Sequence, residues 1–340
     1  MATQALSSSP LTFVDDQTPG ITRRKKGKYF AFFDPKGERI TDREKIDRLR
    51  AIGLPPAYEK CWYCPDPDGH IQATGYDARG RKQYRYHPAF REAQDADKYA
   101  GCSGFGQALP ALRKRVAADL KKRAVDRDRA VAAIVRLLDI GMIRVGNDRY
   151  AEENKSFGAT TLRMRHAAIT GGALRLCYRG KSGKLHDRRV KDAGLLRFVR
   201  AMQDLPGQRL FQYVDDAGER HDVTSTDVNA YLRETMKDEG GPDISAKHFR
   251  TWGGSVTAFS VLYHATGKIG LKTMLEQVAD ALGNTPAISR KSYVHPALLA
   301  LARDGDQEGW RSATRLPRAT EWLSREERGF MAFLEALPES

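Results

Sequence analysis

The sequence predicts an α+β fold, with a small β-rich N-terminal lobe followed by a mostly α-helical C-terminal lobe that carries a small antiparallel sheet. Three observations lead to this prediction. Between residues 28 and 90, apolar and polar residues alternate in short runs separated by Gly, Pro and Asp. From Gln107 onward, apolar residues recur at intervals of three and four. Alternation returns only around residues 159–190. We expect the two lobes to form a C-shaped clamp.

The first lobe is expected to span residues 21–90. Residues 1–20 lack the basic segment and continuous apolar core of a secretory signal, so a disordered polar leader is predicted there. The runs KYFAFFD and ERIT flank an Asp-Pro-Lys-Gly turn and predict a hairpin. A helix is expected over residues 42–53, with Thr41 as its N-cap and Gly53 at its end. The runs YEKCWYC, HIQATGYD and KQYRYHP predict three more strands.

A polar stretch at residues 91–106 predicts a linker, at which the lobes are expected to hinge around a bound partner. The helical lobe is expected to span residues 107–340. Within it, GALRLCYRGK and KLHDRRVK alternate as two strands of a hairpin, with a turn at Ser182-Gly183. Further helices are predicted by AGLLRFVRAMQ, TSTDVNAYLRETM, KHFRTWGGSVTAFSVLYHATG and KIGLKTMLEQVADALG, followed by a tail helix near residues 320–337.

The charge of the chain predicts a polyanionic partner. Lys and Arg total 57 against 43 Asp and Glu, a net charge of +14, and phosphate neutralisation with counterion release favours binding of such a chain to nucleic acid. No apolar run is long enough to span a bilayer.

The 4 cysteines are unevenly placed, which argues for a reducing compartment. Cys61 and Cys64 form a C-x-x-C pair, but a tetrahedral zinc site lacks further close ligands, so buried small hydrophobes are favoured and no metal is expected.

One tyrosine lies in a strongly basic context. Tyr293 follows Ser289, Arg290, Lys291 and Ser292 in the segment AISRKSYVHP. A phenol has an ordinary pKa near 10, and a positive environment would help it attack phosphorus. When the segment is taken alone, a tyrosine that packs its ring and leaves its hydroxyl in water is the favoured explanation.

Three basic positions elsewhere supply further context: Arg144, Lys181 in a predicted hairpin, and Arg250. Cleavage of a phosphodiester without a metal needs cations to neutralise the pentacoordinate transition state. The planar arginine fork suits two phosphate oxygens, and a lysine on a hairpin suits proton donation to a leaving oxygen. Taken singly, each is also explained as a solvated surface charge.

Together and in this order, these residues resemble the type IB DNA topoisomerases in their compact bacterial and poxvirus-like form. The segments that carry the resemblance are IRVGNDRYAEENKSFGATTL, YRGKSGK, KHFRTWGGS and LGNTPAISRKSYVHP. The N-terminal segment GHIQATGYDARGRKQYRYHP also resembles the DNA-clamping domain of that family. The resemblance covers roughly residues 28–305, and no single segment would suffice.

The resemblance implies a mechanism and a partner. Tyr293 would attack the scissile phosphate and form a 3′-phosphotyrosyl link, while Arg144 and Arg250 would hold the non-bridging oxygens. Lys181 would protonate the 5′ oxygen, with assistance from Arg144. Strand rotation and religation would then relax supercoiled duplex DNA without ATP, metal or another cofactor. The expected DNA contacts are Gln83, Tyr84, Tyr86, Lys247 and Arg290. A monomeric bacterial enzyme of the cytoplasm, associated with the nucleoid, is expected.

The chain departs from the family pattern nine residues before the tyrosine, where Asn284 replaces the histidine of most relatives. An asparagine amide can still donate a hydrogen bond to a phosphate oxygen, but it cannot carry a positive charge. We therefore expect activity to be retained with weaker stabilisation of the transition state, and Asn284 to act as neither acid nor base.

Other functions remain open from the sequence. Tyrosine recombinases share the predicted catalytic lobe, although they usually carry histidine at the position of Lys247 and a helical N-terminal region. A P-loop at Gly180-Lys181-Ser182 fails because residue 175 is arginine and not glycine. A non-catalytic DNA clamp would fit the basic charge. The cluster at residues 23–26 is interpreted as a DNA-facing arm that precedes the strands. The four scattered histidines His186, His221, His264 and His295 lack ligand spacing and are expected to pack or be solvated.

Overall fold

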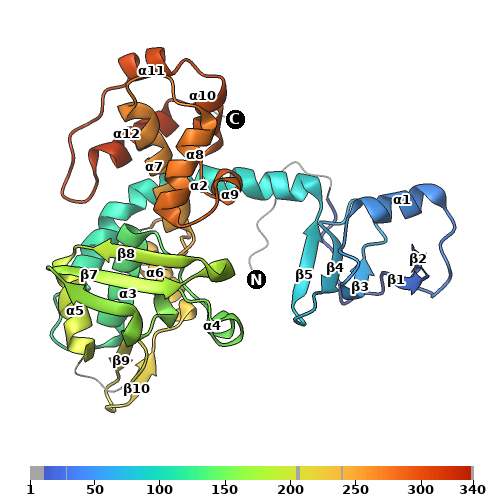
Figure 1. The fold of residues 1–340 in the computed structure, drawn as a ribbon, viewed down its shortest axis with the longest axis horizontal. Coiled ribbons are helices and arrows are strands. Elements are labelled where there is room, and N and C mark those ends of the chain that lie inside the picture. Colours follow the sequence, from blue (N-terminus) through green and yellow to red (C-terminus); the bar gives the residue numbers. More distant parts are fainter. Residues whose placement is uncertain (1–10, 28, 204–206, 239, 338–340) are drawn as a thin grey trace. The chain divides into compact units, whose positions relative to one another are not determined.

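The computed structural model describes residues 11–27, 29–203, 207–238 and 240–337. The chain divides into two compact units, residues 1–98 and 99–340, which Figure 1 shows in blue and in cyan to red. A five-stranded antiparallel sheet lies in the first unit, and helices with small sheets make up the second. The predicted α+β fold is thus confirmed. The C-shaped clamp stays a prediction.

The first unit is one sheet with one helix. Its strand order is β2-β1-β3-β4-β5, and the helix contributes the buried Leu49 to a core with Ile21, Phe32, Tyr63 and Ala73. The bounds of these elements are β1 Ile21–Lys26, β2 Tyr29–Phe33, α1 Arg43–Ala51, β3 Glu59–Tyr63, β4 Ile71–Tyr76 and β5 Lys82–Tyr86.

Three expectations for this unit were wrong. The N-cap of α1 is Asp42 and not Thr41, since the Asp42 carboxylate accepts a hydrogen bond from the Lys45 amide at 2.9 Å. The run ERIT forms no strand beyond a single bridge between Phe33 and Arg39. The basic cluster at residues 23–26 lies inside β1, and the Arg23 guanidinium donates to three backbone carbonyls, those of Leu54, Pro55 and Tyr58.

Part of the predicted leader is structured. Residues 1–10 of that leader lie outside the described residues, but Thr12 pairs with Gly69 and the Asp16 carboxylate lies 2.6 Å from the Lys82 ammonium. The Trp62 indole also donates to the Thr18 carbonyl at 2.9 Å. Residues 11–20 are therefore held against the sheet by contacts that composition does not reveal.

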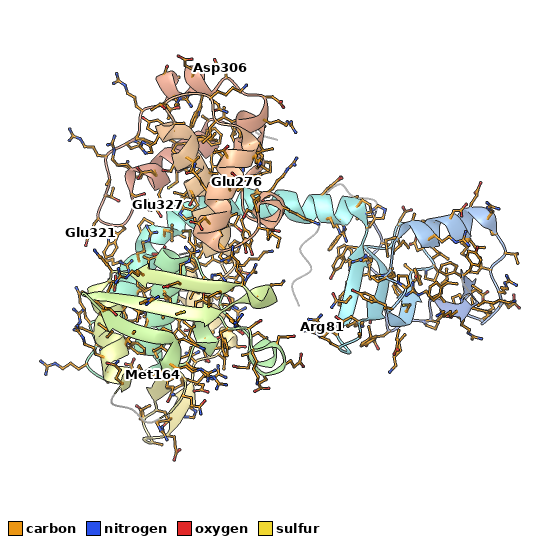
Figure 2. All side chains as sticks on the ribbon, viewed as in Figure 1. Arg81, Met164, Glu276, Asp306, Glu321 and Glu327 are labelled. Carbon is orange, nitrogen blue, oxygen red and sulfur yellow. The ribbon has the colours of Figure 1, made fainter. Side chains whose placement is uncertain are left out.

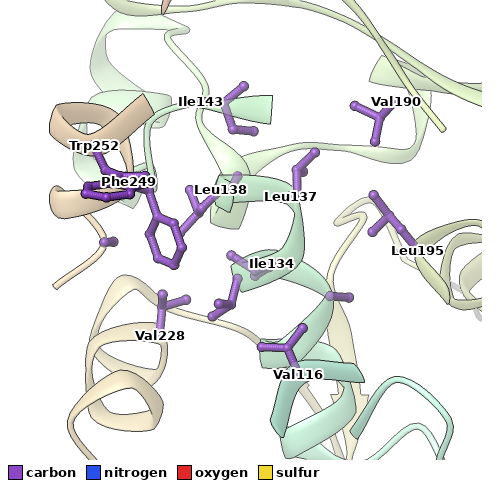
Figure 3. Close-up of a cluster of buried hydrophobic side chains, with 14 of the residues drawn as sticks. Val116, Ile134, Leu137, Leu138, Ile143, Val190, Leu195, Val228, Phe249 and Trp252 are labelled. Carbon is purple, nitrogen blue, oxygen red and sulfur yellow. The ribbon is translucent and has the colours of Figure 1, made fainter. Parts of the chain in front are cut away.

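The long helix α2, Pro88–Asp119, contains the whole predicted linker at residues 91–106. In the second unit it is followed by α3, Arg127–Gly141, whose residues Ala130–Val135, Leu137 and Leu138 are almost wholly buried. Figure 3 shows α3 side chains Ile134, Leu137 and Leu138 among apolar side chains from neighbouring elements. A helix buried on nearly all sides is the centre of this unit's core.

The other elements of the second unit surround α3. The strands form a sheet of order β6-β7-β8 and a separate hairpin β9-β10. The bounds of the helices are α4 Asp148–Asn154, α5 Ala193–Gln203, α6 Ser225–Asp238, α7 His248–His264, α8 Leu271–Leu282, α9 Pro286–Ser292, α10 Pro296–Arg303, α11 Gln307–Ala313 and α12 Arg325–Glu335. The strands are β6 Ala167–Thr170, β7 Ala173–Arg179, β8 Leu185–Val190, β9 Gln212–Val214 and β10 Arg220–Asp222. Among the described helices, none combines the length and the apolar character that a membrane span needs.

A buried ionic network joins α12 to the rest of this unit. The Arg113 guanidinium of α2 makes paired contacts with the carboxylates of Asp139 and Glu327, with closest distances of 2.7 Å to each. Glu327, labelled in Figure 2, also accepts a hydrogen bond from the indole of Trp252 on α7 at 3.1 Å. Burial disfavours the charge of Glu327, but Arg113 outweighs it and holds the pKa of that carboxyl below its ordinary value.

Candidate active site

Tyr293 lies directly after helix α9, where its side chain is buried, with 6% of the residue exposed. Its hydroxyl oxygen accepts a hydrogen bond from Nη1 of Arg144 at 3.1 Å. The guanidinium carbon of Arg250 lies 4.7 Å from the centre of its ring. Two of the predicted cations therefore meet at the predicted nucleophile.

Helix α7 holds the backbone of Tyr293 through two adjacent residues. A Cβ atom at Gly254 would lie 2.7 Å from the carbonyl oxygen of Tyr293, so only glycine permits this approach. The next residue, Ser255, is fully buried. Its hydroxyl donates to the Tyr293 carbonyl at 3.2 Å and accepts from the His295 amide at 3.0 Å. These contacts fix the backbone at Tyr293 and in the two residues that follow it.

Arg250 comes from the same helix and is 4% exposed. Its Nη1 donates to the backbone carbonyls of Met142 and Leu282, the latter at 3.2 Å. Within the described residues, its Nε and Nη2 atoms are buried and make no hydrogen bond. Unsatisfied donors on a buried charge are costly, so their presence indicates a site that is shaped for an anion.

Arg144 and Asn284 are joined beside the phenol. Nη2 of Arg144 donates to the side-chain oxygen of Asn284 at 3.2 Å. The amide nitrogen of Asn284 is buried and makes no hydrogen bond in the described part of the chain. The loop that carries Arg144 is packed tightly, because a Cβ at Gly158 would lie 2.6 Å from both the Arg144 carbonyl oxygen and the Gly146 amide nitrogen.

The electrostatic surroundings favour ionisation of the phenol. Burial raises the pKa of Tyr293, but the positive charges of Arg250 and then Arg144 outweigh burial, so the pKa lies below its ordinary value. Burial also lowers the pKa of the Arg250 guanidinium, which stays far above neutrality in any protein. The site therefore holds two permanent cations against a phenol that loses its proton more readily.

Lys181 is placed apart from this cluster. It lies in the tip that joins β7 to β8, is exposed, and makes no hydrogen bond or ion pair with the other four predicted catalytic residues in the described structure. The structure thus brings together Tyr293, Arg144, Arg250 and Asn284. Lys181 stands at the end of a neighbouring hairpin.

The expected DNA contacts lie on both units. On β5, the exposed rings of Tyr84 and Tyr86 stack at 5.9 Å between centres, and the Gln83 amide donates to the Asp77 carboxylate at 3.2 Å. In the second unit, Lys247 is the exposed residue that precedes α7, and Arg290 is exposed on α9. All five are on the surface or close to it.

The sequence analysis gave no site role to three residues near these side chains, of which Ser289 was noted only as a neighbour of Tyr293 and His186 only as a residue that packs or is solvated. Ser255 bridges two backbone groups, the buried hydroxyl of Ser289 makes no hydrogen bond among the described residues, and His186 stacks on Tyr178 with ring centres 5.0 Å apart. Burial, then Arg188 and other nearby cations, lowers the pKa of His186 to about 4. The pairing of His186 and Arg188 on alternate residues of a strand was the one available signal.

Comparison with known proteins follows the same division of the chain. The family of bacterial DNA topoisomerase IB N-terminal domains matches residues 29–77, and the catalytic core of eukaryotic DNA topoisomerase I matches residues 87–298. DNA topoisomerase 1B of Acanthamoeba polyphaga mimivirus is 30% identical over 303 residues, which are 85% of this chain and 89% of the viral protein. DNA topoisomerase 1B of Vaccinia virus (strain Copenhagen) is 21% identical over 297 residues, 82% of this chain and 89% of the viral protein.

These matches define a class of enzyme that breaks and rejoins DNA. The chain belongs to the type IB DNA topoisomerases, in their compact bacterial and viral form, as its sequence segments predicted. A weaker likeness relates it to a XerH site-specific recombinase bound to palindromic difH substrate, with a TM-score of 0.39 and 15% identity over 56% of this chain and 49% of the other. That likeness is too low to support a recombinase function.

Proposed function

We propose that this chain relaxes supercoiled duplex DNA by cutting one strand through Tyr293, allowing rotation, and resealing the cut. The observation that carries the proposal is the set of unused donors around the phenol. Nε and Nη2 of Arg250 and the amide nitrogen of Asn284 are buried and make no hydrogen bond with the residues that the structure describes, while Arg144 contacts both Tyr293 and Asn284. A phosphate group seated there would satisfy these donors.

In the cleavage step, the Tyr293 oxygen forms a bond to phosphorus as its phenolic proton passes to solvent. The bond from phosphorus to the 5′ oxygen breaks, and its electron pair stays on that oxygen, which receives a proton from Lys181. Arg144, Arg250 and Asn284 stabilise the charge on the non-bridging oxygens. The reverse step reseals the strand, and the covalent link conserves the energy of the phosphodiester, so no ATP is consumed.

Each unit is proposed to contact the duplex. The stacked Tyr84 and Tyr86, with Gln83, would contact it from the first unit. Lys247 and Arg290 would contact phosphates next to the site from the second unit, since exposed cations supply most of the affinity for DNA. The net charge of +14 agrees with such a partner.

The test is relaxation of supercoiled plasmid in EDTA without ATP. The parent chain is expected to relax the plasmid, and Tyr293→Phe is expected to lose relaxation while it binds DNA nearly as well. Tyr263→Phe serves as the control, because that tyrosine lies on α7 and its hydroxyl contacts the Thr314 carbonyl, 3.5 Å away, outside the cluster. Relaxation by Tyr293→Phe would remove Tyr293 as the nucleophile.

A second measurement reports the polarity of the link. Trapped cleavage on a nicked duplex should attach the protein to the 3′ end that the break creates. It should leave a 5′-hydroxyl on the released strand. That strand should accept label from polynucleotide kinase without prior phosphatase treatment. A released strand that needs phosphatase would contradict the proposed step.

A further inference from the structure

Three side chains on one face of strand β8 contact the end of helix α8 and the turn that follows it. We call Lys184, His186 and Arg188 the docking strip. His186 and Arg188 are alternate residues of β8 and therefore point to the same face, and Lys184 is the residue directly before the strand. β8 is one of the two edge strands of its sheet (Figure 1).

The outer two members of the strip are cations that bind backbone carbonyls. The Lys184 ammonium donates to the carbonyl of Asn284 at 2.9 Å. The Arg188 guanidinium donates to the carbonyls of Asp280 and Ala281, both at 2.8 Å. The last carbonyls of a helix have no partner within the helix and carry partial negative charge. The strip therefore caps α8 from outside.

His186 fills the space between these two cations. A Cβ at Gly283 would lie 2.3 Å from the His186 ring, and one at Gly180 would lie 2.5 Å from it, so the ring fits against two glycine backbones. One glycine belongs to the turn before Asn284, and the other directly precedes Lys181. The ring thus packs against both segments at once.

The strip links the hairpin tip that carries Lys181 to the turn that carries Asn284. Lys184 is three residues from Lys181, and the Gly180 amide donates to the Lys184 carbonyl at 2.8 Å, which closes the tip. The partner of Lys184 is the backbone of Asn284, whose side chain contacts Arg144. One hydrogen bond therefore separates the base of the hairpin tip from the arginine and asparagine cluster.

We propose that Lys184 is a positioning residue for the cleavage step, which holds the tip of the β7–β8 hairpin against the turn before α9 so that Lys181 reaches the 5′ leaving oxygen. His186 and Arg188 support the same contact. This inference rests on the proposed function, because it assigns Lys184 an effect that acts through the proton donated by Lys181.

The test is single-turnover cleavage by saturating enzyme on two substrates, an ordinary phosphodiester and a 5′-bridging phosphorothiolate. A thiolate leaves without a proton, so the second substrate does not need a general acid. Lys184→Met should slow cleavage of the ordinary substrate by about 10- to 100-fold, the scale of a misplaced catalytic group, and should leave the phosphorothiolate rate nearly unchanged. Lys184→Arg, which keeps a donor at this position, should recover most of the lost rate.

Arg189→Met is the matched control, since Arg189 is exposed on the opposite face of the same strand and its loss removes the same charge. It should cleave both substrates within about threefold of the parent. The double variant Lys181→Ala with Lys184→Met should be no slower than Lys181→Ala alone, because residues that act as one unit are not additive.

Two outcomes would overturn the inference: equal slowing of both substrates by Lys184→Met, or no slowing of either. The proposed function fails separately. If Lys181→Ala is not rescued by the phosphorothiolate, Lys181 is not the general acid and the basis of the inference is lost. If Lys181→Ala is rescued and Lys184→Met is not, the function stands and the positioning role of Lys184 is wrong.

Discussion

At the scale of single residues, the site is defined by hydrogen-bond capacity that the protein itself does not use. The side-chain oxygen of Asn284 accepts a hydrogen bond from Arg144, whereas its buried amide nitrogen makes no hydrogen bond among the described residues. This arrangement orients the amide, because exchange of its oxygen and nitrogen would face a donor toward the guanidinium. The chain thus presents a fixed neutral donor beside the phenol.

Replacement of Asn284 measures what this donor contributes. Asn284→Ala should slow single-turnover cleavage by about 10- to 100-fold, since a hydrogen bond to a charged group contributes about 1.5–3 kcal/mol. Asn284→His should retain cleavage, because an imidazole also donates from this position. Cleavage by Asn284→Ala at the parent rate would show that the amide does not contact the phosphate.

At the scale of elements, glycines mark where helices approach one another. Gly101 and Gly106 both lie inside α2, but a Cβ at Gly101 meets nothing within 4 Å, whereas one at Gly106 would lie 2.4 Å from the Trp252 ring. Replacement of glycine by alanine favours the helix equally at both positions. The positions differ in whether the added methyl group has space.

Gly101→Ala should raise the free energy of unfolding by about 0.5–1 kcal/mol, the usual cost of glycine in a helix. Gly106→Ala should lower it by about 1–3 kcal/mol, because the added methyl group forces Trp252 to move. Denaturant unfolding followed by the fluorescence of tryptophan provides the measurement. Equal effects at both positions would mean that α2 and α7 do not pack as described.

The elements also show which parts of the structure a sequence can predict. Strong periodicity predicted the β7–β8 hairpin and the helices α5 to α8. The strand β1 was missed because ITRRKK is so basic, and only tertiary contacts reveal that Arg23 binds carbonyls. At the site, the sequence predicted Tyr293, Arg144 and Arg250 because each lies in a segment that resembles the family. Ser255 and His186 have no such pattern, since their roles depend on which backbone groups the fold brings beside them.

At the scale of the whole molecule, one buried and two half-buried histidines link stability to pH. Burial is the largest cause that lowers the pKa of His166, His186 and His295, each to about 4, from an ordinary value of 6.5. The unfolded chain therefore binds more protons than the folded chain between these values. Stability is full above pH 6.5 and is lost as the pH falls toward 4.

These three histidines together should contribute a slope of at most about 4 kcal/mol per pH unit in this window, about 1.4 for each proton. Burial also lowers the pKa values of His70 and His248, which add to the fall in the free energy of unfolding. The pKa of the Glu327 carboxyl is held below 4.5, so the stability that this carboxylate provides is lost only at a lower pH. His295→Asn should reduce the slope by at most about 1.4 kcal/mol per pH unit, the contribution of one proton, measured by urea unfolding at several pH values. An unchanged slope would mean that His295 titrates normally in the folded protein.

The contacts of Arg113 with Asp139 and Glu327 form in the order in which the ribosome makes these residues, and this order affects when the cluster around Tyr293 is complete. The two carboxylate partners of Arg113 lie 26 and 214 residues away along the chain. A nascent chain has Asp139 soon after Arg113, but it lacks Glu327 until long after Tyr293 has been made. Until then the indole of Trp252, two residues from Arg250, also lacks its acceptor. Because domains fold as they emerge from the ribosome, the first unit can form early. Helix α7, which carries Arg250, gains its contact with Glu327 only when α12 arrives, so a partly made chain does not yet hold the complete cluster around Tyr293.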